Sequence, residues 1–138
     1  MAGTLREIAV ATHGPGLTEI TGHLRPLVPP GEGLMTLLVR HTSCSLLIQE
    51  NAAPDVQADL SEWLGRLVPP SDDPSQSWMQ HTAEGPDDMP AHVKAAILPV
   101  SLGIPFTEGH LLLGTWQGIY LWEHRDRPHR RRVAVHLA

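Results

Sequence analysis

The segment HTAEGPDDMPAH (81–92) concentrates side chains that can bind a metal or carry a proton. It has no apolar period of a strand or a helix, so it is not an ordinary core element. A zinc site needs three or four His, Cys, Asp or Glu ligands that converge on one point. His81 and His92 supply two, and His41, at the end of an apolar stretch, supplies a third. We therefore predict a divalent metal, Zn or Mg, on His41, His81 and His92. The alternative is a solvated turn with scattered surface histidines.

The carboxylates of the same segment predict acid–base chemistry. Crowded carboxylates push their pKa values apart, which suits one of them to act as a general base. Glu84 and Asp87 are the predicted catalytic residues. Asp88 is better explained as a cap for a helix that begins near Pro90, where a negative charge is favourable.

Other polar residues predict a pocket for an anionic substrate. Five of the ten basic residues lie in the last fourteen positions, where a guanidinium of Arg125 could grip an anion or simply line a solvated turn. Lys94 is the only lysine. Cys44 is expected to be a small buried hydrophobe and not a nucleophile. The predicted substrate-binding residues are Ser43, Glu50, Asn51, Lys94, Trp116, Gln117 and Arg125.

Composition narrows the class of protein. An apolar content of 41% over 138 residues predicts one folded domain, residues 1–138. The formal charge of −5 argues against nucleic acid as the main partner. Without a membrane-length apolar run, a secretory signal or a second cysteine, we expect a cytoplasmic protein with no membrane partner.

The elements that must position these side chains are expected to be short strands and two or three helices. The best helix begins at Pro54, with an apolar face of Val56, Leu60, Trp63, Leu64 and Leu67. Weaker helices are expected over 18–27 and from about Pro90 to Ile97. Strands are expected over 34–40, 45–49, 100–106, 110–114, 117–123 and 132–137. Short connections favour antiparallel pairing. The fold class is therefore α+β, a largely antiparallel sheet or sandwich covered by helices.

Three segments together resemble one known family: HTSCSLLIQENAAPDV (41–56), HTAEGPDDMPAH (81–92) and LGTWQGIYLWEHRDRPHRR (113–131). They are similar to the YjbQ-like family along nearly the whole chain. The resemblance implies a compact α+β domain, a homotrimer, and histidine-rich pockets that place His41, His81 and His92 on the family's histidine positions. The chain departs from the family pattern at Cys44, Ala53 and Thr82, where Ala, Asp and Asn are usual.

The resemblance also implies an activity, thiamine-phosphate synthase, in which a pyrimidine group passes from its pyrophosphate to a thiazole phosphate. Such a reaction needs a divalent ion on the leaving group and cations for phosphate. A chain of 138 residues is too short for a (β/α)8 barrel of about 250 residues. Two alternatives stay open: a zinc-assisted hydrolase with Glu84 as base, and a non-enzymatic trimer that binds a small anion. The expected partners are a small phosphorylated substrate and further copies of the chain.

Overall fold

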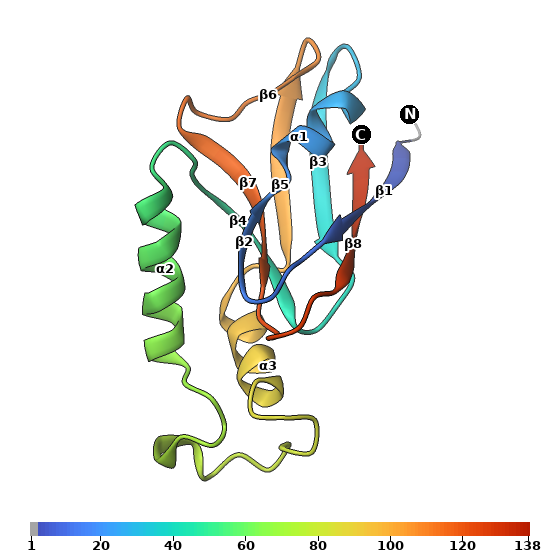
Figure 1. The fold of residues 1–138 in the computed structure, drawn as a ribbon. Coiled ribbons are helices and arrows are strands. Elements are labelled where there is room, and N and C mark those ends of the chain that lie inside the picture. Colours follow the sequence, from blue (N-terminus) through green and yellow to red (C-terminus); the bar gives the residue numbers. More distant parts are fainter. Residues whose placement is uncertain (1–2) are drawn as a thin grey trace.

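The structure is a computed structural model that describes residues 3–138. Its strands form two antiparallel sheets (Figure 1). The first has the order β1-β8-β3-β5-β6, and the second has the order β2-β7-β4. The strands of the first sheet are β1 (Thr4–Ala11), β3 (Glu32–Val39), β5 (Ser101–Thr107), β6 (His110–Leu111) and β8 (Arg130–Leu137). Those of the second are β2 (Gly16–Glu19), β4 (Cys44–Glu50) and β7 (Gln117–Glu123).

One hydrophobic core joins the two sheets. Strand β3 alternates, with Met35, Leu37 and Val39 buried and the residues between them exposed, as expected for a sheet with one solvated face. Strand β7 instead lies between two neighbours and is buried from Gly118 to Glu123. The core residues of the second sheet include Leu46, Ile119 and Leu121.

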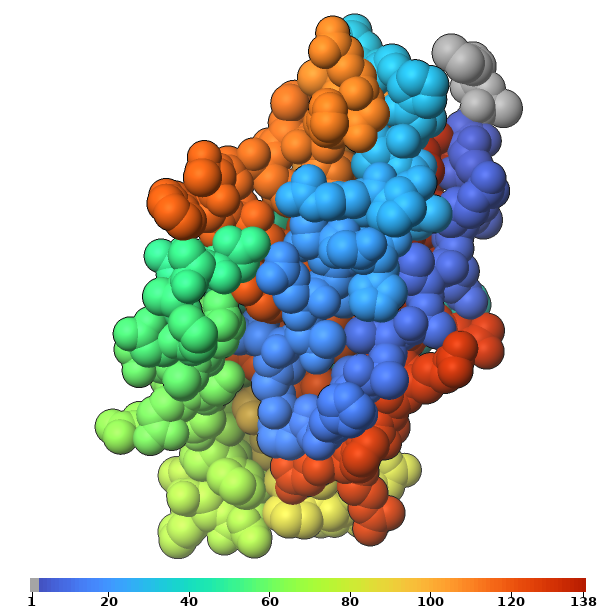
Figure 2. Space-filling view, turned by 45° about the horizontal axis from the view of Figure 1, so that its top comes forward, coloured from blue at the N-terminus to red at the C-terminus, as the bar shows by residue number. Residues whose placement is uncertain are grey.

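The helices are α1 (Thr21–Leu24), the 3-10 turn η1 (Arg25–Leu27), α2 (Pro54–Leu67), η2 (Pro74–Gln76) and α3 (Asp88–Ile97). Helix α2 lies at one side of the sheets and α3 at one end, whereas α1 lies at the upper part of the sheets (Figure 1). In the space-filling view, α2 (green) runs along one side, and the segment that follows it closes the lower end of the molecule beside α3 (Figure 2). No helix within residues 3–138 is long and apolar enough to cross a membrane.

The α+β class and the largely antiparallel sheets are confirmed. The helix from Pro54 is also confirmed, but its apolar face is only partly covered. Leu64 is buried, whereas Trp63 and Leu67 are about half exposed at 51% and 54%. The reason is that α2 lies against the sheet edge, so much of its surface faces solvent (Figure 1).

Two sequence-based expectations about helix positions need correction. Residues 18–27 begin as β2, because this segment pairs with β7, and only then form α1 and η1. Tertiary pairing thus outweighs a weak helix signal. Helix α3 begins at Asp88, two residues before Pro90. Pro90 fits inside the first turn, because the N–H group that proline lacks would have no intrahelical partner there. Strands β1 and β2 are not predicted from the sequence.

Candidate metal site

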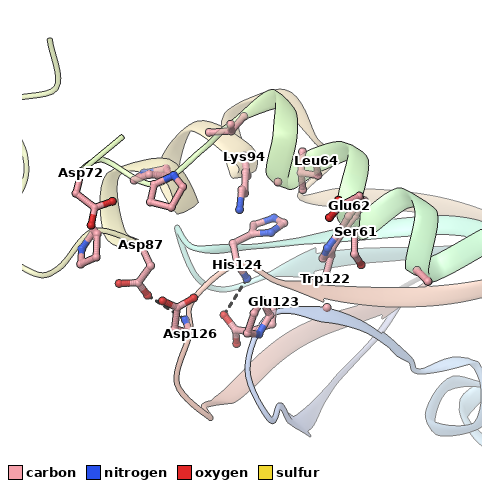
Figure 3. Close-up of a pocket in the computed structure, with 18 residues that line it drawn as sticks. Ser61, Glu62, Leu64, Asp72, Asp87, Lys94, Trp122, Glu123, His124 and Asp126 are labelled. Carbon is pink, nitrogen blue, oxygen red and sulfur yellow. Dashed lines mark hydrogen bonds between the residues drawn. The ribbon is translucent and has the colours of Figure 1, made fainter. Parts of the chain in front are cut away.

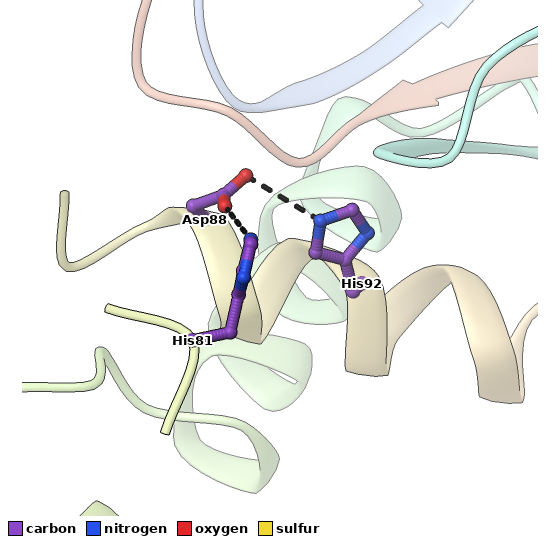
Figure 4. A group of neighbouring side chains, drawn as sticks. All are labelled: His81, Asp88 and His92. Carbon is purple, nitrogen blue, oxygen red and sulfur yellow. Dashed lines mark ion pairs between the residues drawn. The ribbon is translucent and has the colours of Figure 1, made fainter. Parts of the chain in front are cut away.

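His81, Asp88 and His92 form one cluster at the start of α3 (Figure 4). His81 lies on the loop between η2 and α3. Asp88 and His92 are four residues apart on α3, which places them on one face of the helix. One potential ligand atom from each of the three residues lies within 4.8 Å of the others. The sequence-based pairing of His81 with His92 is therefore seen in the structure, with Asp88 between them.

The distances within the cluster resemble those between ligands of one metal ion. His81 Nε2 lies 2.8 Å from Asp88 Oδ2, and His92 Nε2 lies 3.6 Å from Asp88 Oδ1. Ligands about 2.0–2.1 Å from a tetrahedral zinc are about 3.3 Å apart. The two imidazole rings meet edge to face, with centroids 5.6 Å apart. The two distances between histidine and carboxylate, which involve different oxygens of Asp88, thus lie on either side of this spacing.

Asp88 is the most constrained member of the cluster. The residue is 1% exposed, and its Oδ1 accepts a hydrogen bond from Arg125 at 2.8 Å. Its Oδ2 is buried and has no hydrogen-bond partner among the described residues. The 2.8 Å contact with His81 does not satisfy it, because that contact lacks hydrogen-bond geometry. A buried carboxylate oxygen without a partner is costly, so this atom is available as a ligand for a cation.

The backbone orients His92. Its Nδ1 lies 3.2 Å from the carbonyl oxygen of Thr42, which can only accept a hydrogen bond. The proton of a neutral His92 therefore belongs on Nδ1, and the lone pair of Nε2 faces Asp88. Metal-binding histidines are commonly held in this way by a carbonyl.

His41 is outside this group of three. The backbone N–H of Ser43 donates to His41 Nδ1 at 3.0 Å, so a neutral ring carries its proton on Nε2. Burial, followed by the charge of Arg131, lowers the pKa of His41. This geometry favours an N–H donor at Nε2 over a metal ligand. The metal role of His41 stays a prediction.

The two predicted catalytic carboxylates lie beside the cluster. Glu84 is exposed and lines a cavity of about 400 Å³ together with Arg125 and His129. Asp87 accepts hydrogen bonds from the Arg125 side chain at 2.8 Å and from the Asp126 backbone at 2.9 Å. Burial acts to raise the pKa of Asp87, but these hydrogen bonds hold it below its usual value. Asp87 thus resembles an anchor for Arg125 more than a general base.

Arg125 binds carboxylates of the chain itself. Its Nε contacts Asp87, its Nη1 contacts Asp88, and its Nη2 donates to the Glu84 carbonyl at 3.2 Å. The expected helix cap at Asp88 is wrong, since the helix begins at Asp88 itself and Asp87 occupies the N-cap position. The sequence signal that marks this site is the Asp-x-x-x-His spacing of 88–92, which becomes visible once the helix is known to begin at Asp88.

A buried ion pair supports the neighbouring loop. Glu123 accepts two hydrogen bonds from Arg131, at 2.8 and 2.7 Å, and one from Thr12 at 2.8 Å. Its Oε2 also accepts hydrogen bonds from the backbone N–H groups of His124 and Arg125. Burial acts to raise the pKa of Glu123, but the hydrogen bonds of Arg131 and Thr12 hold it low. This pair fixes the backbone from which Arg125 reaches the cluster.

The predicted substrate-binding residues separate into two places. Ser43, Lys94 and Arg125 lie near the cluster end, where Cys44 pairs with Glu123. Glu50 pairs with Gln117 at the other end of the same strands, and the Asn51 backbone donates to the Trp116 carbonyl. The six residue steps from Cys44 to Glu50 along β4 span about 20 Å. The structure therefore does not bring Glu50, Asn51, Trp116 and Gln117 to the His81–Asp88–His92 cluster.

Lys94 points into a cavity of about 490 Å³ between α2, α3 and the end of β7 (Figure 3). Its ammonium has no ion pair within residues 3–138, and burial lowers its pKa. His124 lines the same cavity and lies 2.8 Å from the Ser45 hydroxyl. Burial and the nearby charge of Lys94 lower the pKa of His124 to about 3.

The fold and this cluster define a small α+β protein of two antiparallel sheets with a candidate metal site at a helix start. Residues 6–138 match the family model "UPF0047 protein YjbQ-like", so the chain belongs to the YjbQ-like (UPF0047) family, as the sequence resemblance predicts.

Similar proteins cover nearly the whole chain. The UPF0047 protein sll1880 of Synechocystis sp. is 45% identical and covers 99% of this chain and 95% of its own length. UPF0047 protein YjbQ of Salmonella typhimurium is 44% identical, over 86% of this chain and 83% of that protein. A solved structure of a conserved hypothetical protein of Thermus thermophilus has a TM-score of 0.84 at 33% identity, covering 96% of this chain and 99% of that one.

Proposed function

We propose that this chain is a metal-dependent enzyme whose divalent ion is bound by His81, Asp88 and His92. One observation carries the proposal: Asp88 is buried between two imidazoles and has an oxygen without a hydrogen-bond partner in the described chain. Three protein ligands are the usual number in catalytic zinc sites, which leave a position for water or substrate.

The ligand set favours zinc over magnesium. Imidazole nitrogens suit Zn and other late transition metals, whereas Mg²⁺ prefers oxygen ligands and keeps several waters. Two of the three groups are histidines. Arg125 binds Oδ1 of Asp88, whereas His81 lies against Oδ2, and the Thr42 carbonyl orients His92. Such second partners fix the ligands before the ion binds.

A bound ion would supply Lewis acidity to an oxygen of the substrate. This is the chemistry needed when a pyrophosphate leaves, as in the thiamine-phosphate synthase reaction implied by the family resemblance. We propose this transfer as the first reaction to test. Glu84 is exposed beside the cluster, but Asp87 is engaged by Arg125, so proton transfer is assigned to Glu84 alone.

The test uses metal-free protein with Zn²⁺, Co²⁺ or Mg²⁺ added back. We expect bound Co²⁺ to give the visible absorption typical of a low coordination number. Added Zn²⁺ should displace the Co²⁺ and remove this absorption. Pyrophosphate release from the pyrimidine pyrophosphate, with thiazole phosphate present, should require the ion and be lost in Asp88→Asn. Release at the same rate without metal would contradict the proposal. Asp59→Asn, an exposed carboxylate of α2, is the matched control.

A further inference from the structure

A third pocket, of about 260 Å³, is lined only by basic residues. It lies where β3 ends and β8 begins, and its lining residues are Arg40, His41, Arg130, Arg131 and Arg132. The backbone N–H of Arg40 donates to the carbonyl of Arg132, so the two arginines lie across from each other on neighbouring strands. Like charges in this arrangement destabilise a sheet. The concentration of charge is notable in a chain whose net charge is −5.

The chain itself neutralises only part of this charge. Glu7 is shared by Arg40 and Arg132, at 2.8 and 3.2 Å, and Glu123 binds Arg131. Arg130 is exposed and has no ion-pair partner in the part of the chain that the structure describes. Four guanidinium groups against two carboxylates leave two positive charges without a counter-charge.

His41 adds a neutral donor. The Ser43 backbone N–H occupies its Nδ1, so Nε2 carries the proton. His41 is also next in sequence to Thr42, whose carbonyl contacts His92 of the metal cluster. The basic pocket and the cluster are therefore neighbours joined by residues 41–42.

We propose that this pocket binds the phosphate group of a phosphate monoester whose reacting part faces the His81–Asp88–His92 cluster. A phosphate monoester carries a charge of about −1.5 to −2 at pH 7, which matches the uncompensated charge. Guanidinium groups bind phosphate oxygens through paired N–H donors. The proposal rests on the proposed function for the role of the cluster, but the binding of phosphate does not need the metal.

The test is calorimetric titration of the metal-free protein with glycerol phosphate and, separately, with inorganic phosphate. We expect saturable binding of both. Arg130→Gln should weaken both by about tenfold, the effect of one lost charge-assisted hydrogen bond. Arg25→Gln removes the same charge from an exposed position on η1 and should change the affinity by less than about twofold. Circular dichroism checks that each variant is folded.

Three results would overturn the proposal: no saturable binding, equal weakening in Arg130→Gln and Arg25→Gln, or binding of inorganic phosphate without the ester. His81→Ala separates this proposal from the metal proposal. It should bind glycerol phosphate as well as the wild type does. If the wild type binds phosphate but no metal, the proposed function fails and the pocket stands. If the wild type binds metal but no phosphate, the phosphate-pocket proposal fails and the proposed metal site stands.

Discussion

His81 Nε2 lies 2.8 Å from Asp88 Oδ2, an oxygen that is buried and makes no hydrogen bond with the described part of the chain. The other oxygen of Asp88 is held by Arg125 at 2.8 Å. Asp88 is therefore divided: Oδ1 is fixed by Arg125 and lies 3.6 Å from His92 Nε2, whereas Oδ2 faces His81 and makes no hydrogen bond in the described chain, an arrangement that suits a metal ligand.

Asp88→Asn tests the carboxylate. The amide is a weaker ligand, so metal affinity should fall by at least about a hundredfold. Without metal, the variant should lose about 1–3 kcal/mol of unfolding free energy, because Arg125 keeps only Asp87 as an ion-pair partner. Urea unfolding of the metal-free proteins measures the second effect. Unchanged metal affinity would remove Asp88 from the site.

Arg125→Lys tests whether this arginine orients the cluster or binds substrate. Lysine lacks the planar fork of donors with which arginine binds Asp87 and Asp88 at once. Asp88 would then be held less firmly, so metal affinity should fall by about tenfold. Phosphate affinity should be unchanged, because the guanidinium is already engaged by carboxylates. Weaker phosphate binding with unchanged metal binding would instead return Arg125 to the substrate role predicted from the sequence.

The buried His124 predicts a pH effect on stability. Its pKa of about 3 in the folded protein lies below the ordinary value of 6.5, so the unfolded chain binds the proton more readily. The contribution of neutral His124 to the unfolding free energy is fully present above pH 6.5 and is lost as the pH falls towards 3. At pH 5, His124 alone should lower the unfolding free energy by about 2 kcal/mol relative to its value above pH 6.5.

The measurement is urea unfolding at pH 7.5 and pH 5 for the wild type and His124→Gln. Glutamine can still bond Ser45 but does not titrate, so the difference between pH values should shrink by about 2 kcal/mol. Glu123, whose pKa is held low, contributes only at more acidic pH. An equal pH dependence in both proteins would show that His124 is not buried as described.

The outer face of the first sheet predicts self-association. Leu5, Leu34 and Leu38 are 69%, 46% and 48% exposed on this face. Apolar sheet faces of this kind are commonly buried between subunits. We expect a homotrimer of 15.1 kDa chains by light scattering at micromolar concentration. Leu34→Glu should reduce the mass to that of one chain, and Leu112→Glu, also exposed but on the β6 side, should not. A monomeric wild type would contradict this expectation.

The sequence predicts the antiparallel α+β class and the participation of His81 and His92, because strand alternation and an unusual polar segment are local signals. It does not predict that Asp88 joins them, since an aspartate before Pro90 has an equally good local explanation as a helix cap. The partners of Arg125 and Arg131 depend on which strand ends meet. That information is long-range, as is the separation of Glu50 and Asn51 from the cluster.

The central claim is that His81, Asp88 and His92 bind one metal ion. The most direct measurement is the metal content, by atomic absorption, of protein exposed to Zn²⁺ and then desalted. We predict roughly one ion per chain in the wild type and in His110→Ala, a control at an exposed histidine, and well under half in His81→Ala and His92→Ala, with unchanged circular dichroism. Equal metal in the wild type and both cluster variants, or none in any of them, would contradict the claim.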